Sequence, residues 1–404
     1  MVHASDPLQV LWLCGPAGVG KTTVGWELFT RLTASGLPAG YVDIDHLGIF
    51  LPGPPEDPEL HRMKTRNLAA VLANFHEGGA RCVVVSGVVD PEQGVYADEL
   101  PGITLTVCRL RADREELARR FIGRGMQTHR VQETLDEADV MDVSGFGDVC
   151  IDTTGSDVTE VVQLVAERIG DWTGPGRCVA EPRAGGPSAP LPPSRPSSTG
   201  PAPSSPEPRI PAAGARVLWL CGPTGVGKST IGWPVYQCVR SSARTAYVEL
   251  DQLAFLCPAP PDDLANHRLK ARNLAALWRA YSDAGAEVLI ANGPVEDGAT
   301  VETYTAVLPD ADVTVCRLHA SRTVLTERIK SRGRGGSWPA PGDPLKGRPT
   351  EELLRIADEA AATAGALERA ALGHLRIDTD DRTVEESAAV ITAAWPTRYH
   401  SDRG

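Results

Sequence analysis

The chain of 404 residues contains the same series of motifs twice, in the same order. Such ordered self-similarity is typical of a tandem duplication, and the length exceeds the roughly 250–300 residues at which one hydrophobic core usually divides. We therefore predict two domains of one kind, at residues 1–173 and 216–404. The matching segments are VLWLCGPAGVGKTTVGW (10–26) with VLWLCGPTGVGKSTIGW (217–233), AGYVDIDHL (39–47) with TAYVELDQL (245–253), HRMKTRNLAAV (61–71) with HRLKARNLAAL (267–277), and LTVCRL (105–110) with VTVCRL (313–318).

Residues 174–215, between the two copies, differ in composition from the rest of the chain. They hold 12 of the 33 prolines, many serines and glycines, and few large apolar residues. Such a segment buries too little apolar surface to offset the entropy lost on ordering, so we predict a disordered tether. A tether permits the two domains either to move independently or to dock on each other. If they are independent, cutting within 174–215 should release two folded halves.

Overall composition is that of an ordinary globular protein, with 42% hydrophobic and 23% charged residues. The formal net charge of −12 argues against broad binding to nucleic acid or to anionic membranes. The nine cysteines lack metal-binding spacing and predict free, mostly buried thiols in a reducing compartment. The apolar run near the N-terminus stops at Gly15, which is too short for a signal peptide or a membrane span. We expect a cytoplasmic protein.

Five apolar segments in the first copy alternate with helical patterns. Their continuous Val, Ile and Leu content is typical of parallel strands covered on both faces. Asp113 followed by Glu116 marks the start of one of the helices. We predict an α/β fold with two domains, each a mostly parallel five-stranded sheet flanked by helices. The five predicted strands are QVLWLC (9–14), AGYVDID (39–45), CVVVSG (82–87), ITLTVCRL (103–110) and DVCIDT (148–153).

Residues 15–22 and 222–229 both fit the pattern G-x-x-x-x-G-K-[ST], each after an apolar strand and before a helical pattern. In this pattern glycines let backbone N–H groups surround phosphates, the lysine reaches the β- and γ-phosphates, and the hydroxyl of Thr22 or Ser229 ligates Mg²⁺. The N-terminus of the following helix also favours an anion. The alternative is a glycine turn that has lost its ligand. We therefore predict that both copies are P-loop NTPase domains. The two nucleotide sites would be formed by Gly15, Ala17, Gly18, Val19, Gly20, Lys21, Thr22 and Thr23, and by Gly222, Thr224, Gly225, Val226, Gly227, Lys228, Ser229 and Thr230.

Two carboxylates, Asp43 and Asp45, end the second predicted strand. Alternate residues of a strand point to the same side, and ligands of open parallel sheets bind at the carboxyl ends of the strands. One carboxylate could then hold the Mg²⁺ water shell while the other accepts a proton from a substrate hydroxyl. The second copy keeps Glu249 and Asp251. The alternative is a solvated strand end with helix-capping aspartates.

A basic helix carries Arg62 and Arg66, which are four residues apart and therefore share one face. Their guanidinium groups suit a carboxylate or phosphate of a substrate. Arg268 and Arg272 occupy the matching places in the second copy. The alternative is a solvated helix face.

Arginines also follow the fourth predicted strand, and glycines follow the arginines as in a mobile lid. Such arginines can clamp a triphosphate and stabilise the transferring phosphoryl group. The alternative is a solvated, arginine-rich helix end. The residues are Arg119, Arg120 and Arg124 in the first copy and Arg328 and Arg332 in the second.

Together, the P-loop, Asp43-x-Asp45, the arginine-rich lid and the closing Ile151-Asp152-Thr153 resemble the small P-loop kinases: shikimate kinase, gluconate kinase, adenylyl-sulfate kinase and chloramphenicol phosphotransferase. The resemblance implies a five-stranded parallel sheet, ATP with Mg²⁺ as phosphoryl donor, and a closing lid. It further implies that Asp43 serves the metal, that Asp45 orients the acceptor hydroxyl, and that the segment at Asp152 and Thr153 lines the adenine pocket.

From these residues we expect transfer of the γ-phosphoryl group of ATP to a small hydroxylated or anionic metabolite. The catalytic residues would be Lys21, Asp45, Arg120 and Arg124, with Lys228 and Asp251 in the second copy. The first copy should be the better catalyst. In the second, Glu249 replaces Asp43, and Pro234 replaces Glu27 inside a predicted helix that it should kink or end. The alternative is a non-enzymatic regulatory protein in which ATP orders the lids and docks the domains.

Overall fold

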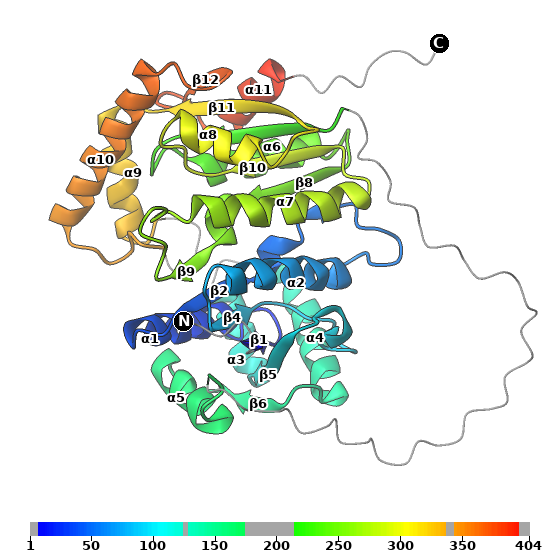
Figure 1. Ribbon diagram of the computed structural model, residues 1–404. Coiled ribbons are helices and arrows are strands. Elements are labelled where there is room, and N and C mark those ends of the chain that lie inside the picture. Colours follow the sequence, from blue (N-terminus) through cyan, green and yellow to red (C-terminus); the bar gives the residue numbers. More distant parts are fainter. Residues whose placement is uncertain (1–6, 124–127, 174–213, 337–342, 396–404) are drawn as a thin grey trace, which may run out of the picture.

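A computed structural model describes residues 7–123, 128–173, 214–336 and 343–395 (Figure 1). The described residues within 7–173 form the first half of the molecule, and those within 214–395 form the second half. Each half is built around one sheet. The predicted tether, apart from Gly214 and Ala215, lies outside the described residues, and so does Arg124.

The first half has the following elements in chain order: β1 (Leu8–Cys14), α1 (Lys21–Ala34), β2 (Ala39–Asp43), the 3₁₀ turn η1 (Ile44–Leu47), β3 (Phe50–Leu51), α2 (His61–Glu77), β4 (Cys82–Ser86), η2 (Ala97–Glu99), β5 (Ile103–Arg111), α3 (Arg114–Gly123), η3 (Thr128–Arg130), α4 (Val131–Ser144), β6 (Val149–Asp152) and α5 (Val158–Ile169).

The second half has a matching series: β7 (Arg216–Cys221), α6 (Lys228–Val239), β8 (Thr245–Glu249), η4 (Leu250–Leu253), β9 (Phe255–Cys257), α7 (His267–Asp283), β10 (Val288–Asn292), α8 (Gly298–Thr305), β11 (Asp312–His319), α9 (Arg322–Gly333), α10 (Thr350–Arg369), β12 (Leu375–Asp378) and α11 (Val384–Ala394).

Five parallel strands form the body of each sheet, as predicted. The orders are β6-β5-β1-β4-β2 and β12-β11-β7-β10-β8, so the strand that leads into each P-loop is central. Both its neighbours pair with it in parallel, as Leu11 does with Val84 of β4 and Thr106 of β5. α1 and α5 cover one face of the first sheet, where Val24, Leu28 and Val165 are buried. The predicted α/β fold is confirmed.

Each sheet has a sixth strand, and it comes from the other half. β3 pairs antiparallel with β8, with Phe50 opposite Ala246, while β9 pairs antiparallel with β2, with Leu256 opposite Gly40. The backbone N–H of Tyr247 also donates to the carbonyl of Ile49 at 2.9 Å. The expectation of five strands per sheet was therefore incomplete, because the sixth is only two or three residues long and belongs to the other copy.

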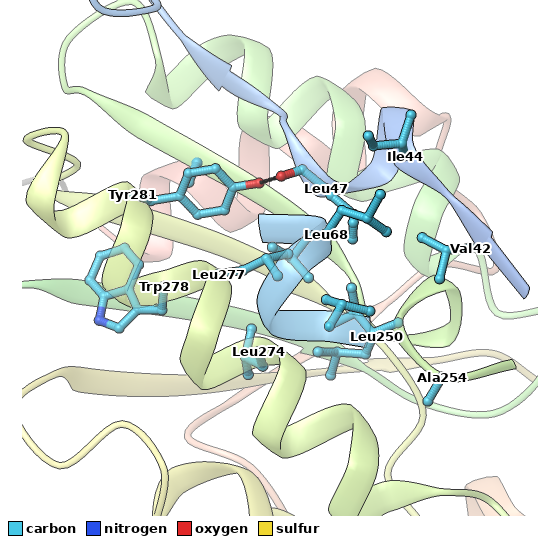
Figure 2. Close-up of a cluster of buried hydrophobic side chains, with 14 of the residues drawn as sticks. Val42, Ile44, Leu47, Leu68, Leu250, Ala254, Leu274, Leu277, Trp278 and Tyr281 are labelled. Atoms are coloured by element: carbon cyan, nitrogen blue, oxygen red, sulfur yellow. Dashed lines mark hydrogen bonds between the residues drawn. The ribbon is translucent and has the colours of Figure 1, made fainter. Parts of the chain in front are cut away.

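A shared hydrophobic core lies between the two sheets. α2 and α7 run side by side there (Figure 1), and Asn74 donates to the side-chain oxygen of Asn273 at 2.8 Å. One buried cluster includes Leu47 and Leu68 from the first half together with Leu250 and Leu277 from the second (Figure 2). The two halves are thus joined by backbone ladders and by apolar burial.

This arrangement contradicts the expectation that a cut between the copies would release two folded halves. Separation would remove a strand from each sheet and expose side chains such as Phe50, which is fully buried. Unpaired backbone groups and exposed apolar surface are both unfavourable in water.

The helix that carries Pro234 does not end at that residue. α6 continues through it to Val239, and the residues on its inner face, Ile231 and Val235, stay buried. Proline removes one backbone donor, but packing against the sheet offsets that loss. Of the two expected effects of Pro234, a kink or an early end, the early end is therefore wrong.

Among the described helices, none combines the length and the apolar composition needed to cross a bilayer. The eight cysteines of the described residues are free thiols. Five of them are buried: Cys14, Cys82, Cys108, Cys221 and Cys316.

Candidate nucleotide and acceptor site

The loop between β1 and α1 has the backbone geometry of a phosphate-binding loop. Gly15 has a φ of +139°, and a Cβ placed there would lie 2.2 Å from the carbonyl oxygen of Leu110. Gly222 repeats this geometry, with a φ of +140° and a distance of 2.7 Å to the carbonyl oxygen of Leu318. Only glycine fits such a position without strain. Gly20, which precedes α1, has no side chain to cap the helix, so the first N–H groups of α1 face the loop.

The lysine of each loop lies over the loop itself. Lys21 Nζ donates to the carbonyl oxygens of Gly15 at 2.8 Å and Pro16 at 2.9 Å, and Lys228 makes the same two bonds in the second half. Burial lowers the pKa of Lys21, while the carboxylates of Asp45, Glu137 and Asp43 act in the opposite direction. Each lysine is thus held at the loop that would receive phosphates.

Asp43 and Asp45 lie together, but not for the predicted reason. β2 ends at Asp43, and Asp45 belongs to η1 rather than to the strand. They meet because the Asp43 carboxylate caps η1, accepting the backbone N–H of Asp45 at 3.1 Å. The alternative of a capping aspartate is correct in this respect. Asp43 is nevertheless only 9% exposed, so the strand end is not solvated.

Burial and the nearby charge of Asp45 raise the pKa of Asp43, and the backbone N–H of Asp45, the charge of Lys21 and the Thr22 hydroxyl lower it. A cation placed beside this carboxylate would relieve the repulsion between the two aspartates. Hydroxyl and carboxylate oxygens are suitable ligands for Mg²⁺, and nucleotide phosphates and water would complete its coordination shell. Thr22 and Asp43 therefore fit the predicted metal role. Within the described residues, no group of three or more His, Cys, Asp or Glu side chains is placed to hold a metal ion.

Glu249 behaves differently from Asp43, its counterpart. Its longer side chain reaches the P-loop, where the hydroxyl of Ser229 donates to it at 2.9 Å, and the hydroxyl of Tyr247 also donates to it. Burial raises the pKa of Glu249, an effect opposed by these two hydrogen bonds and by His46 of the first half. The hydroxyl of Ser229, predicted to ligate a metal, is thus bonded to the acidic residue of the second half.

Two lysines that the sequence analysis overlooked face the second carboxylate of each pair. Lys64 Nζ lies 3.6 Å from Asp45, and Lys270 Nζ lies 3.2 Å from Asp251. Both are largely buried, although they belong to the basic helices predicted to bind substrate. The sequence could have indicated this role, because the lysine is repeated in both copies and lies two residues after Arg62 or Arg268. That spacing places it on a different face of the helix from the arginines.

The four predicted substrate arginines lie against acidic side chains. Arg62 and Arg66 share a face, as predicted, and both bond to Glu99, Arg66 at 3.0 Å and Arg62 at 3.4 Å. In the second half, Arg268 lies 2.8 Å from Asp262, whereas Arg272 pairs at 3.1 Å with Glu77 of the first half. The structure thus brings the first pair together and separates the second.

Arg120, predicted to clamp phosphates, holds the P-loop to the end of the sheet. It donates to the carbonyls of Val19 at 3.3 Å and Thr153 at 2.8 Å, and to Glu116 at 2.7 Å. Arg328 repeats the backbone contacts in the second half, with Val226 and Thr379. These contacts make Arg120 and Arg328 positioning residues.

The remaining lid arginines differ in their surroundings. Arg119 bonds to Glu116 on the exposed side of α3. Arg332 pairs with Asp343 at 3.1 Å. Burial lowers the pKa of Lys228, and the charge of Arg332 acts in the same direction.

Comparison with known proteins agrees with this geometry. Residues 11–142 match the family described as AAA domain. The matched segment runs from β1 into α4 and contains the first phosphate-binding loop. The resemblance to the P-loop group is thereby confirmed at the level of the fold. No curated protein gives a significant sequence match to the chain.

Three solved structures illustrate what this chain is similar to. The Deinococcus radiodurans tunicamycin resistance protein is 21% identical, with a TM-score of 0.32, over 40% of this chain and 96% of its own. Shikimate kinase from Acinetobacter baumannii, in complex with shikimate, is 20% identical, with a TM-score of 0.29, over 41% and 95%. The Mycobacterium tuberculosis APS kinase, in complex with AMPPNP and APS, is 17% identical, with a TM-score of 0.29, over 45% and 97%.

Another acidic side chain of the P-loop domain, Glu137, was missed because nothing in the sequence of α4 distinguishes it from neighbouring acids. It is half-buried, and burial raises its pKa, while the charge of Lys21 lowers it. α4 therefore brings a carboxylate within electrostatic range of both the P-loop lysine and Asp45.

Proposed function

We propose that the chain is an ATP-dependent phosphotransferase that moves the γ-phosphoryl group to a small hydroxylated or anionic metabolite in the cytoplasm. One observation carries the proposal: the buried lysine of a P-loop lies within electrostatic range of two adjacent carboxylates, Asp43 and Asp45, at the same edge of the sheet. That edge is where parallel α/β sheets bind ligands.

In this proposal different residues of the first half bind the phosphates, hold the metal and accept the proton. Backbone N–H groups of the loop and Lys21 bind the phosphates, while Thr22 and Asp43 hold Mg²⁺, which neutralises charge on the β- and γ-oxygens when bound. The acceptor hydroxyl oxygen forms a bond to the γ-phosphorus as the bond to the ADP oxygen breaks, and Asp45 takes the hydroxyl proton. Lys64 holds Asp45 in place. Arg120 positions the loop, and Arg124 would clamp the phosphates.

The first half is proposed as the better catalyst. Each hydroxyl lies beside its acidic residue, but Glu249 also accepts from the side chains of Tyr247 and, at 3.4 Å, Asn292. Freeing Glu249 from Tyr247 for a metal would cost one hydrogen bond to a charged group, about 1.5–3 kcal/mol. Lys228 and Asp251 would serve the same roles as Lys21 and Asp45, at a lower rate.

The test is incubation of the full chain with Mg²⁺, ATP and a metabolite extract, followed by mass spectrometry. The control is the Lys21→Ala/Lys228→Ala double variant, checked for folding by circular dichroism. We expect a phosphorylated compound that appears only with the wild-type chain. A folded wild-type chain that binds ATP and yields no product would contradict the proposal and favour the non-enzymatic regulatory alternative.

A second prediction separates the two carboxylates. Asp45→Asn should lower kcat by roughly 100-fold and leave the KM for ATP within about twofold, because a general base acts in the transition state. Asp43→Asn is the matched variant, and it should weaken Mg²⁺-dependent ATP binding instead. Steady-state kinetics with varied ATP checks both. Equal losses of kcat and ATP affinity in Asp45→Asn would assign that residue to the metal.

A further inference from the structure

The strands that exchange between the halves are attached to the acidic residues of the two sites. β2, which ends at Asp43, pairs with β9 of the second half, and β8, which ends at Glu249, pairs with β3 of the first half. β3 follows η1 after two residues, and η1 contains Asp45. One short stretch, residues 43–51, therefore begins in the first site and ends beside the strand that carries the acid of the second.

A continuous series of contacts leads from this stretch into the second site. The Ile49 carbonyl accepts the backbone N–H of Tyr247 at 2.9 Å, and the hydroxyl of Tyr247 donates to Glu249. Glu249 in turn accepts from Ser229 of the P-loop at 2.9 Å. A displacement of residues 49–51 would therefore shift Tyr247 and, through Glu249, the position of Ser229 in the second P-loop.

A corresponding series leads from the second half into the first site. The ring of Phe255 lies 5.0 Å from that of Trp26 and 5.9 Å from that of Tyr41, measured between centroids. The Tyr41 hydroxyl bonds to Ser86 at 2.8 Å and donates to the carbonyl of Thr22 at 3.5 Å. Thr22 is the residue predicted to ligate the metal. In both directions a tyrosine of the acid-bearing strand transmits the contact.

We propose that each phosphate site is completed by a segment of the other half, so that a nucleotide bound at one P-loop changes the nucleotide affinity of the other. This proposal rests on the nucleotide binding stated under Proposed function, but not on phosphoryl transfer. Coupling between two sites is a free energy, and by linkage each nucleotide changes the affinity of the other by the same factor.

Tyr281 offers a way to weaken the junction without touching either site. Its hydroxyl donates to the Leu47 carbonyl at 2.9 Å and lies 3.4 Å from the Ile49 backbone N–H, which donates to it (Figure 2 shows the first of these bonds). Tyr281, which belongs to the second half, therefore holds residues 47–49 of the first half in place. The first half has Phe75 at the corresponding position of α2, so phenylalanine is compatible with this packing.

The coupling is measured by calorimetric titration of the full chain with Mg²⁺ and a non-hydrolysable ATP analogue. Lys228→Ala reports the first site alone, and Lys21→Ala reports the second. The product of the two wild-type association constants, divided by the product of the two single-site constants, is one for independent sites. We expect this ratio to differ from one by threefold or more in either direction.

In Tyr281→Phe, the logarithm of this ratio should fall in magnitude to half of its wild-type value or less, while both loops still bind the analogue. The control is Trp395→Phe, which removes a partly buried hydrogen bond of 3.1 Å to Thr314 of β11, on the other side of the second sheet from β3, and should leave the ratio unchanged. A ratio of one in the wild-type chain, or binding of a single nucleotide per chain, overturns the coupling. Absence of nucleotide binding at both loops overturns the proposed function as well.

Discussion

Cutting the chain between residues 174 and 213 is expected to leave the two halves bound to each other as one species of 43.0 kDa. The reciprocal ladders and the shared core do not require the connecting segment. A site for a specific protease placed in that segment makes the cut. Size-exclusion chromatography before and after cleavage measures the result, with the uncut chain lacking the protease site as control.

The size of the effect follows from the buried residues. Leu47, Phe50, Leu277 and Tyr281 have exposures of zero, and each contributes roughly 1.5–3 kcal/mol by its burial. Together with the two strand pairings, this approaches the total of about 5–15 kcal/mol that stabilises a typical domain. Either half expressed alone should consequently precipitate, or associate with a second copy of itself. Two cleaved halves that separate as folded monomers would contradict the structure.

Lys21→Ala is expected to lower acceptor-dependent ADP release by about 100-fold or more, since a buried cation at the transferring phosphate acts in a medium of low dielectric. A factor of 100 corresponds to about 2.7 kcal/mol of transition-state stabilisation. Lys228→Ala is the matched variant, and its effect on turnover should be much smaller. The acceptor is the compound identified from the metabolite extract.

Both variants need a folding control, because each lysine also bonds two loop carbonyls. Thermal unfolding followed by circular dichroism supplies it. If Lys21→Ala retains its rate and Lys228→Ala loses it, the chemistry belongs to the second half. That outcome would contradict the proposed division of work between the halves.

The body of the fold was predictable because its signals are local and long. Each of the five strands is a run of four or more mostly apolar residues, and the P-loop pattern fixes the turn between β1 and α1. The exchanged strands were not predictable by the same reasoning. β3 has two residues, too few for any period to be recognised, and its partner β8 lies about 200 positions away in the chain.

The site was predicted in part for comparable reasons. Residue types and spacing identify Lys21, Thr22 and the carboxylate pair, since the chemistry requires them. Spacing could not reveal that Asp43 caps a 3₁₀ turn, that Arg120 bonds to backbone carbonyls, or that Lys64 faces Asp45. Each of these depends on how elements distant in the sequence pack, and a single sequence contains no direct record of packing.

The reciprocal exchange has the form of a two-fold axis placed inside one polypeptide. In a symmetric homodimer with this interface, any substitution would occur on both sides at once. In this chain a substitution can occur in one half only. Corresponding positions indeed differ, with Tyr281 in the second half where the first has Phe75, and Glu249 where the first has Asp43. One site of the pair can therefore change without the other, even for a task other than catalysis, while the shared core keeps both folded.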